Sequence, residues 1–298
     1  MNCIISIFHV QNQKSMYKNK LVIVTVTYNP DIEELDLFIQ SFFKYNDLDD
    51  CARLVVVDNS PESNDSCKRI VSKYSAVSYV PNPSNPGFGA SNNIGFHEYD
   101  SDYVLFINND VEFTEPVFRN IIRIIEADES IGCVGIHQTG GAPSFFVKIT
   151  APKMVSMEKF NEFHHFISGA FMFFKSSVFK MIGEFDERLF MYYEEFDISE
   201  RLIQANYHTI YCPQFSFLHK AAGRRIMNEF ASLKGSESLA YICKKYGIDP
   251  TAKTNSDICR WRKFQVYHLL KFNFKEVLKL QRIINSRKRI IEKFRMDN

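Results

Sequence analysis

Short apolar stretches rich in β-branched residues alternate with segments of helical periodicity from Leu21 onward. The apolar stretches are predicted strands, and they cover residues 21–28, 53–58, 76–80, 102–107 and 131–137. The intervening segments place apolar side chains three and four positions apart, as in helices packed on a sheet. These predicted helices cover residues 32–45, 66–75 and 116–128. The alternation predicts an α/β fold with a mostly parallel central sheet flanked by helices.

The pattern changes after residue 137. An aromatic, strand-like stretch at 163–174 precedes an amphipathic helical pattern at 192–207, which indicates a second half packed against the first. Beyond Pro250 many Lys and Arg surround apolar residues at loosely helical spacing, which predicts a C-terminal helical appendage. Its apolar positions are Trp261, Phe264, Leu270, Phe274, Val277, Ile284, Ile291 and Phe294. The expected division is a flexible leader (1–19), a first half (20–137), a second half (138–248) and a basic C-terminal segment (249–298).

Composition limits which partners and which cellular compartment are expected for this protein. A chain of 298 residues with 45% hydrophobic content can bury a large core. The net charge of +1 gives no global field that would favour nucleic acid, so we expect no nucleic-acid partner. Seven scattered cysteines without a CxxC pair fit the reduced thiols of a cytoplasmic protein. The sequence has no stretch of roughly 18 uninterrupted apolar residues, so we expect any membrane contact to be peripheral.

Polar residues follow four of the predicted strands, at the sheet edge where open parallel sheets bind ligands. They are Thr27, Tyr28 and Asn29 after the first strand, Asp58 and Asn59 after the second, Asn85, Gly87, Phe88, Gly89 and Asn93 after the third, and Asn108, Asn109 and Asp110 after the fourth. Each group alone is typical of an ordinary turn. Because all four line one edge, together they indicate a binding site.

The side chains at this edge suit a nucleotide and a divalent cation. Asp58 can accept hydrogen bonds from a pyrimidine base or from ribose hydroxyls, and Gly87 and Gly89 allow a ligand to approach the backbone closely. Asp110 is a hard oxygen ligand suited to Mg²⁺ or Mn²⁺. Both acids have a structural alternative, because Asp58 could cap the next helix and Asp110 could cap a helix at Thr114.

Five segments in a fixed order carry a family resemblance: VIVTVTYNP, VVVDNS, NPGFGASNNIG, FINND and GEFDERLFMYYEEFDISERL. In this order and spacing, the chain resembles the inverting family-two glycosyltransferases, especially the bacterial rhamnosyltransferase-like branch that builds surface polysaccharides. The resemblance covers residues 21–246, and its ordered set of motifs is far more specific than any single one. It implies a GT-A, Rossmann-like fold, with nucleotide-sugar binding in 20–137 and the acceptor side in 138–248.

The resemblance also implies the donor and metal sites. The donor is expected to be a UDP- or dTDP-sugar, with Asp58 at the position that binds the nucleoside. The segment Asn108–Asp110 occupies the place of the D-x-D metal motif, and Asn108 stands where that motif has its first acid. An amide brings no charge, so a weaker affinity for Mg²⁺ or Mn²⁺ is expected. His219 corresponds to a histidine that completes the metal site in many relatives.

The resemblance places the catalytic base in the acidic segment at 194–197. Glu195 lies at the position of the usual aspartate, and Glu194 is the alternative because adjacent side chains point in different directions. The base would take a proton from an acceptor hydroxyl as its oxygen attacks the anomeric carbon with inversion, while the metal stabilises the departing nucleoside diphosphate. The expected acceptor is a lipid-linked oligosaccharide of O-antigen or capsule synthesis. The structural alternative for this acidic cluster is a solvated helix start.

Two basic segments have roles that the sequence leaves open. Residues 221–230, which include Gly223, Arg224 and Arg225, are expected to form either a mobile lid over the donor phosphates or an exposed basic loop. One of two equally weighted interpretations of the segment after Pro250 is attachment to the inner face of the cytoplasmic membrane. The alternative is that it packs on the domain or forms a homodimer.

Two other functions compete with sugar transfer. A nucleotidyltransferase needs a glycine-rich, basic loop after the first strand, and this chain has Thr27–Pro30 there. A catalytically silent nucleotide-sugar-binding or scaffold protein is favoured by the missing acid at Asn108 and by Glu195 in place of aspartate. Because glutamate keeps the carboxylate, we expect an active enzyme.

Overall fold

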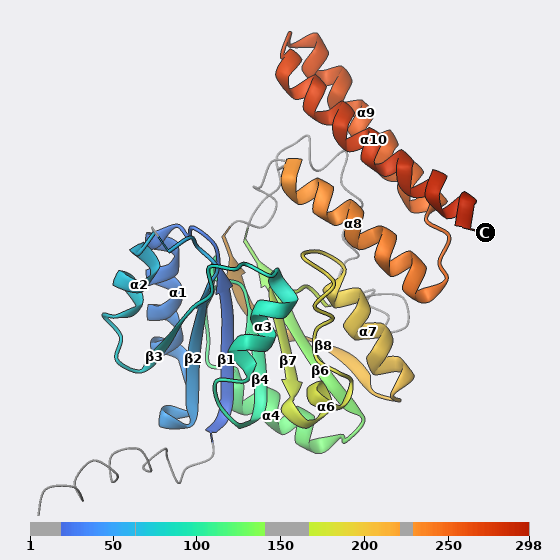
Figure 1. Cartoon of the computed structure of the whole chain (residues 1–298). Helices are drawn as coiled ribbons and strands as arrows, with labels where there is room; N and C mark the ends of the chain where they lie inside the picture. The colour runs from blue at the N-terminus through green and yellow to red at the C-terminus, as the bar shows by residue number, and fades with distance from the viewer. Residues whose placement is uncertain (1–18, 63, 141–166, 221–228, 298) are drawn as a thin grey trace, which may run out of the picture.

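The structure is a computed structural model that describes residues 19–62, 64–140, 167–220 and 229–297 (Figure 1). The strands are β1 (Asn19–Thr27), β2 (Ala52–Asp58), β3 (Val77–Pro81), β4 (Ser101–Ile107), β5 (Val111–Phe113), β6 (Ile131–Thr139), β7 (Phe171–Lys175) and β8 (His208–His219). The helices are α1 (Ile32–Tyr45), the short 3-10 helix η1 (Asp49–Cys51), α2 (Ser66–Val71), α3 (Phe88–Phe96), α4 (Phe118–Ala127), α6 (Ser176–Met181), α7 (Glu194–Gln204), α8 (Glu229–Tyr246), α9 (Thr251–Leu270) and α10 (Phe274–Asp297). Residues 1–18 of the predicted leader lie outside the described residues.

One eight-stranded sheet joins these strands in the order β3-β2-β1-β4-β7-β6-β8-β5. The first four are parallel, β7 is antiparallel to both of its neighbours, β6 and β8 are parallel, and β5 is antiparallel to β8. The predicted α/β class with a mostly parallel sheet is confirmed. Strands of both predicted halves, 20–137 and 138–248, belong to this one sheet. The assignment of the first half to the donor and of the second to the acceptor therefore stays a prediction.

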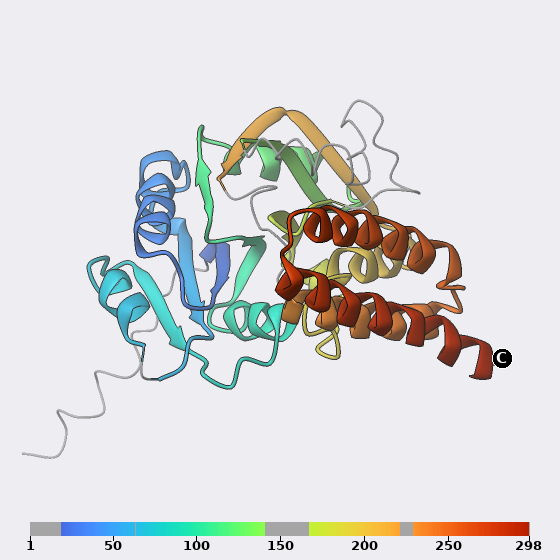
Figure 2. The same ribbon diagram turned by 90° about the horizontal axis from the view of Figure 1, so that it is seen from above.

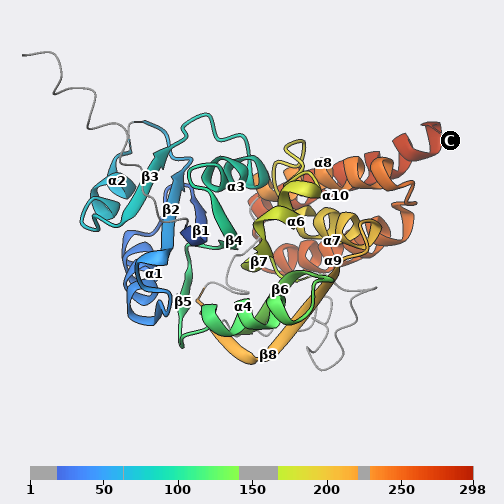
Figure 3. The same ribbon diagram turned by 90° about the horizontal axis from the view of Figure 1, so that it is seen from below.

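The central strands are buried on both faces, which explains why they are apolar at nearly every position. Along β1, Leu21 and Ile23 face one core, with α1 and α4, whereas Val22 and Val24 face the other, with α3, α6 and α7. Figure 3 shows these two helical layers on opposite sides of the sheet. The carboxyl ends of β1 to β4 are therefore the part of these strands left for a ligand.

The antiparallel direction of β7 decides which residues reach that edge. Its first residue, Phe171, pairs with Ile107 at the carboxyl end of β4. Consequently Gly169 and Ala170, which precede β7, lie beside the Asn108–Asp110 segment that follows β4. The Asn108 N–H donates to the Ala170 carbonyl at 3.3 Å.

A buried charge cluster fastens α8 to the sheet. Asp197 on α7 accepts a hydrogen bond from the Tyr246 hydroxyl at 2.7 Å, and Asp186 accepts one from Tyr241 at 2.7 Å. The Lys245 ammonium contacts both carboxylates, at 2.8 Å from that of Asp186. Burial opposes the ionisation of Asp186, but the hydrogen bonds that it accepts hold its pKa well below the usual range. Asp186 is therefore ionised beside Lys245, which joins it to Asp197.

Replacing Lys245 by Met is expected to lower the free energy of unfolding by about 2 kcal/mol, because two buried carboxylates lose their shared cation but keep Arg188 and Arg201 as charged partners. Lys234→Met is the matched control on the same helix, since Lys234 forms its ion pair with the exposed Glu237 at 2.8 Å and otherwise lies over the rings of Phe190 and Phe230, which Met can still contact. It should change stability by less than about 1 kcal/mol. Urea titration of both variants measures the difference, and equal losses would show that the cluster does not hold α8.

The C-terminal segment is helical, as predicted. Helices α9 and α10 pair lengthwise, and α10 packs on α8 through buried side chains that include Leu280 and Ile284. Seen from above in Figure 2, the two helices lie side by side. Not all of the predicted apolar positions are covered, because Leu270 and Phe274 are exposed. None of the described helices is long and apolar enough to cross a bilayer.

Candidate functional site

Backbone and side-chain contacts join the segments that follow β1 to β4 at one edge of the sheet. The Asn59 N–H donates to the Thr27 carbonyl at 2.8 Å, and the Asn82 N–H donates to the Asp58 carbonyl at 2.7 Å. The Asn109 amide lies 3.5 Å from the Thr27 hydroxyl. The structure therefore brings the predicted strand-end residues together.

Asp58 lies buried at the carboxyl end of β2. Its carboxylate accepts hydrogen bonds from the Ser60 N–H and from the Tyr79 hydroxyl, each at 3.0 Å. Burial, and then the Asp58 carboxylate, raise the pKa of Tyr79, so this phenol stays a donor. The capping alternative for Asp58 is wrong, because α2 begins only at Ser66. Tyr79 was not predicted as a site residue. Its position on β3, the strand next to β2, is the feature of the sequence that could have indicated its contact with Asp58.

A network of amides fixes the loop after β3. The Asn59 side chain donates to the Ser91 hydroxyl at 2.9 Å and to the Asn85 side-chain oxygen at 3.2 Å, and it accepts from the Asn82 side-chain amide at 2.7 Å. Both polar atoms of the Asn59 side chain therefore form hydrogen bonds within the protein. Asn82 and Ser91 belong to the polar stretch after the third predicted strand but were not predicted to bind the donor. The parallel register of β2 and β3 brings Asn82 to Asn59, and the start of α3 brings Ser91 there.

The glycines of this loop approach protein backbone in the structure. Gly87 has a φ of +113°, and a Cβ there would lie 2.4 Å from the Phe190 carbonyl oxygen. A Cβ at Gly89 would lie 2.9 Å from Cβ of Phe185. The Asn93 side chain donates to the Phe185 carbonyl at 3.0 Å and accepts its N–H at 3.1 Å. These contacts clamp the loop to the segment that leads into α7.

Three further predicted donor residues differ in exposure. Tyr28 presents its side chain to solvent at the end of β1. Asn29, with a φ of +45°, donates its N–H to the Ser60 hydroxyl at 2.7 Å. Phe88 lies edge-on to Phe185 with ring centroids 6.2 Å apart. Tyr28 and Asn29 are thus both exposed, whereas Phe88 is half-buried.

Asp110 and His219 meet on neighbouring strands. Asp110 immediately precedes β5, which pairs with β8, and the last residue of β8 is His219. The Asp110 Oδ1 atom lies 3.1 Å from His219 Nε2, and both side chains are largely buried. The alternative that Asp110 caps a helix at Thr114 is wrong, because a strand follows it. The expectation that a strand carries His219 to this place is confirmed.

These residues fit part of a divalent-metal site. A carboxylate oxygen and an imidazole nitrogen are ligands that Mn²⁺ and Mg²⁺ accept, and His219 Nδ1 is buried with no hydrogen-bond partner among the described residues. The described residues hold no group of three or more His, Cys, Asp or Glu side chains placed to bind a metal. The protein thus offers Asp110 and His219, and a bound ion would need further oxygens from the donor or from water.

An irregular turn places the acidic segment. Tyr192 and Tyr193 have φ values of +69° and +74°, which costs non-glycine residues on the order of 1 kcal/mol each. Helix α7 begins directly afterwards. Glu195 Oε1 accepts the Gly169 N–H at 3.0 Å, and a Cβ at Gly169 would lie 2.5 Å from that oxygen. Gly169 therefore positions Glu195, although sequence analysis did not select it.

The two glutamates differ in their environments. Glu194 is buried, and its Oε1 has no hydrogen-bond partner among the described residues. Burial and then repulsion from Glu195 raise the pKa of Glu194 well above its usual range. Burial also raises the pKa of Glu195, against the opposing effect of the Gly169 N–H. The pair thus favours a single charge on Glu195, which rules out a fully solvated helix start.

Residues 221–228, which hold Gly223, Arg224 and Arg225 of the predicted lid, lie outside the described residues. The site described above is therefore built from the strand ends, the segment before β7 and the start of α7.

The sequence model of Glycosyl transferase family 2 matches residues 22–182, more than half of the chain. The chain therefore belongs to this family. The hexosyltransferase Agl10 of low-salt glycan biosynthesis in Haloferax volcanii is 26% identical over 214 residues, which cover 67% of this chain and 66% of that protein. Rhamnosyltransferase WbbL of Escherichia coli K12 is 25% identical over 199 residues, 58% of this chain and 74% of its own length. These relatives confirm the predicted rhamnosyltransferase-like branch.

Solved structures show the same fold. Mannosyltransferase PcManGT of Pyrobaculum calidifontis, in complex with GDP-Man and Mn²⁺, has a TM-score of 0.57 and 13% identity over 95% of this chain and 77% of its own. Residues 1–349 of TarS from S. aureus, in complex with UDP, have a TM-score of 0.51 and 14% identity over 94% of this chain and 92% of that one. The predicted GT-A fold is confirmed.

Proposed function

We propose that this protein transfers a hexosyl or rhamnosyl group from a nucleoside diphosphate sugar to an acceptor hydroxyl, with inversion and with help from a divalent metal. One observation carries the proposal: hydrogen bonds through Gly169 and Ala170 connect the Glu195 carboxylate to the Asn108–Asp110 segment. The proposed base thus lies beside the same stretch of chain as the segment that carries the proposed metal ligand Asp110. That is what a single displacement at an anomeric carbon requires.

Each residue has a defined task in this proposal. Asp58, oriented by Tyr79, binds the base or ribose of the nucleotide. Asp110 and His219 would hold the cation, which when bound offsets the charge on the departing diphosphate. Glu195 takes the proton of the attacking hydroxyl. Because the neighbouring Glu194 stays neutral, Glu195 is the charged member of the pair. Inversion follows because the acceptor attacks from the face opposite the leaving group.

The acceptor is proposed to be a lipid-linked oligosaccharide in surface polysaccharide synthesis. A stretch of 76 residues is 33% identical to an N-acetylglucosaminyl-diphospho-decaprenol L-rhamnosyltransferase of Mycobacterium tuberculosis, whose name specifies a lipid diphosphate acceptor. Such an acceptor would keep the enzyme at the inner face of the cytoplasmic membrane. The relatives named above likewise build glycans or transfer rhamnose.

A panel of nucleoside diphosphates tests the donor site by thermal unfolding. UDP or dTDP with Mn²⁺ at about a hundred times its dissociation constant should stabilise the protein by about 2.7 kcal/mol. UMP with Mn²⁺ is the matched control and should stabilise far less, because it lacks the diphosphate that the metal joins to Asp110. Hydrolysis of the corresponding sugar donor then reports turnover. Metal-dependent binding without hydrolysis or transfer would instead favour a catalytically silent protein.

A further inference from the structure

Exposed apolar side chains gather at the turn between α9 and α10. Leu270, Phe272 and Phe274 are 75%, 80% and 58% exposed, and consecutive turns of both helices add Val266, Leu269 and Leu278. We call these six residues the apolar tip. Large exposed apolar clusters of this kind are typical of surfaces that contact another molecule or a membrane.

The same helices carry a strong positive charge. Residues 251–297 contain 13 Lys and Arg and four Asp and Glu, a net charge of +9 in a chain whose total is +1. The side chains of Arg262, Lys263, Lys271 and Lys275 are exposed and form no ion pair or side-chain hydrogen bond with the described residues, although the Lys271 ammonium lies over the Tyr267 ring. Cations that surround an apolar tip complement an anionic, partly apolar surface.

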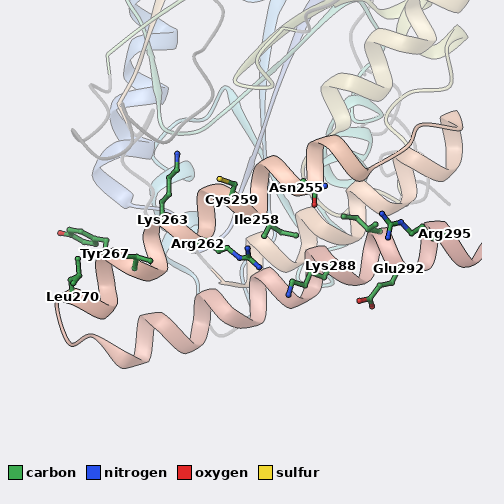
Figure 4. Close-up of a pocket in the computed structure, with 12 residues that line it drawn as sticks. Asn255, Ile258, Cys259, Arg262, Lys263, Tyr267, Leu270, Lys288, Glu292 and Arg295 are labelled. Carbon is green, nitrogen blue, oxygen red and sulfur yellow. The ribbon is translucent and has the colours of Figure 1, made fainter.

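A groove between α9 and α10 extends from the apolar tip along the hairpin. Its volume is about 860 Å³, and Ile258, Val266 and Leu270 contribute to its apolar lining. Arg262 and Lys288 extend into it from the two helices (Figure 4). Four Lys and Arg residues and one acid, Glu292, line the groove, so its net positive charge favours an anion, and the apolar lining suits an acyl chain beside it.

The hairpin is held in a fixed position relative to the candidate active site. The buried Asp257 on α9 binds Lys253 at 2.8 Å and Arg260 at 3.0 Å, and lies 3.6 Å from the Arg287 guanidinium of α10. Arg287 also donates to the Gly235 carbonyl of α8 at 3.4 Å. In Figure 1 the hairpin lies beyond α8, on the side of the molecule toward which β1 to β4 run, with the α9–α10 turn pointing away from the sheet.

We propose that the α9–α10 hairpin is a membrane-insertion element for an anionic phospholipid bilayer. The apolar tip enters the boundary between headgroups and acyl chains, and Arg262, Lys263 and Lys288 contact the lipid phosphates. Lys263 is seven residues from Leu270, about 10 Å along a helix, which matches the burial depth of interfacial helices. A second copy of this chain is disfavoured as the occupant, because its unpaired cations would face those of the first. The benefit to catalysis rests on the proposed lipid-linked acceptor, whereas bilayer binding can be measured without it.

The test is sedimentation of the full chain with vesicles. Vesicles with about a third phosphatidylglycerol should bind the protein, pure phosphatidylcholine vesicles should bind it weakly, and added salt should reduce binding. The double variant Leu270→Glu, Phe272→Glu should bind at least tenfold more weakly. Met181→Glu is the matched control, because Met181 is 57% exposed on α6, outside the hairpin, and it should bind like the wild type.

Two results would overturn the proposal. One is equal vesicle binding by the wild type and the double variant. The other is a wild-type dimer in lipid-free solution that the double variant converts to a monomer, which would assign the apolar tip to a second copy. Hydrolysis of the sugar donor in water should be unchanged in the double variant, which also shows that it is folded. Failure of sugar transfer with intact vesicle binding would count against the proposed function and not against the hairpin.

Discussion

Replacing Glu195 by Gln should lower kcat by on the order of a thousandfold while leaving the Kd of the nucleotide donor nearly unchanged. The amide keeps the shape of the side chain and can still accept the Gly169 N–H, which the wild-type Oε1 accepts at 3.0 Å. It cannot take a proton from the acceptor. Transfer assays at saturating donor, together with donor titration, separate the two effects.

Glu194→Gln is the matched control for the choice between the adjacent glutamates. Glu194 is buried and favoured in its neutral form, so an amide there resembles the wild-type side chain. We expect a much smaller loss of kcat. Equal losses in the two variants, or a larger loss at Glu194, would show that Glu195 is not the base. Gly169→Ala gives an independent check, because its Cβ would displace the Glu195 carboxylate and should lower kcat without removing any acid.

The pH profile follows from the same pair. Glu195 must be deprotonated to act as the base, and burial raises its pKa. The rate should therefore fall as the pH drops through a pKa above that of an ordinary glutamate, and this acidic limb should vanish in Glu195→Gln. In Glu194→Gln an amide replaces a carboxyl that is favoured in its neutral form, so the limb should stay close to its wild-type position. A large shift of the limb in Glu194→Gln would show that Glu194 carries charge while Glu195 titrates.

Asp110→Ala should weaken Mn²⁺-dependent donor binding by about a hundredfold, as expected when a charged ligand to a cation is removed. Asp110 is the only acid of the Asn108–Asp110 motif, so the motif has no other carboxylate to take over. Calorimetric titration of UDP with and without Mn²⁺ measures the loss. Binding in the absence of metal should change little.

Two variants define the specificity of that effect. Glu112→Gln removes an acid two residues away that pairs with Lys220, and it should retain metal-dependent binding. His219→Ala should weaken binding in the same direction as Asp110→Ala, because the two side chains are 3.1 Å apart. If donor binding by Asp110→Ala depends on Mn²⁺ as strongly as in the wild type, Asp110 is not a metal ligand. The metal and the donor phosphates would then be bound by other residues.

The apolar pattern located most of the central elements because the central strands and their covering helices are buried in a regular way. The helix predicted at 32–45 is α1 itself, and β2, β4 and α7 differ from their predicted bounds by at most three residues. The pattern did not predict β5, since three residues show no periodicity. The helix predicted at 66–75 is shorter, ending at Val71. Exposed Leu270 and Phe274 look like core positions when only spacing is considered.

The sequence by itself determined the α/β class, the family, and the acids and amides at the strand ends, because these depend on local composition and on the order of motifs. Only the tertiary structure decided that Tyr79 orients Asp58, that His219 faces Asp110, and that Gly169 holds Glu195. Each of these contacts joins residues from different elements. Their meeting depends on strand register, on the antiparallel course of β7 and on the pairing of β5 with β8, none of which local periodicity encodes.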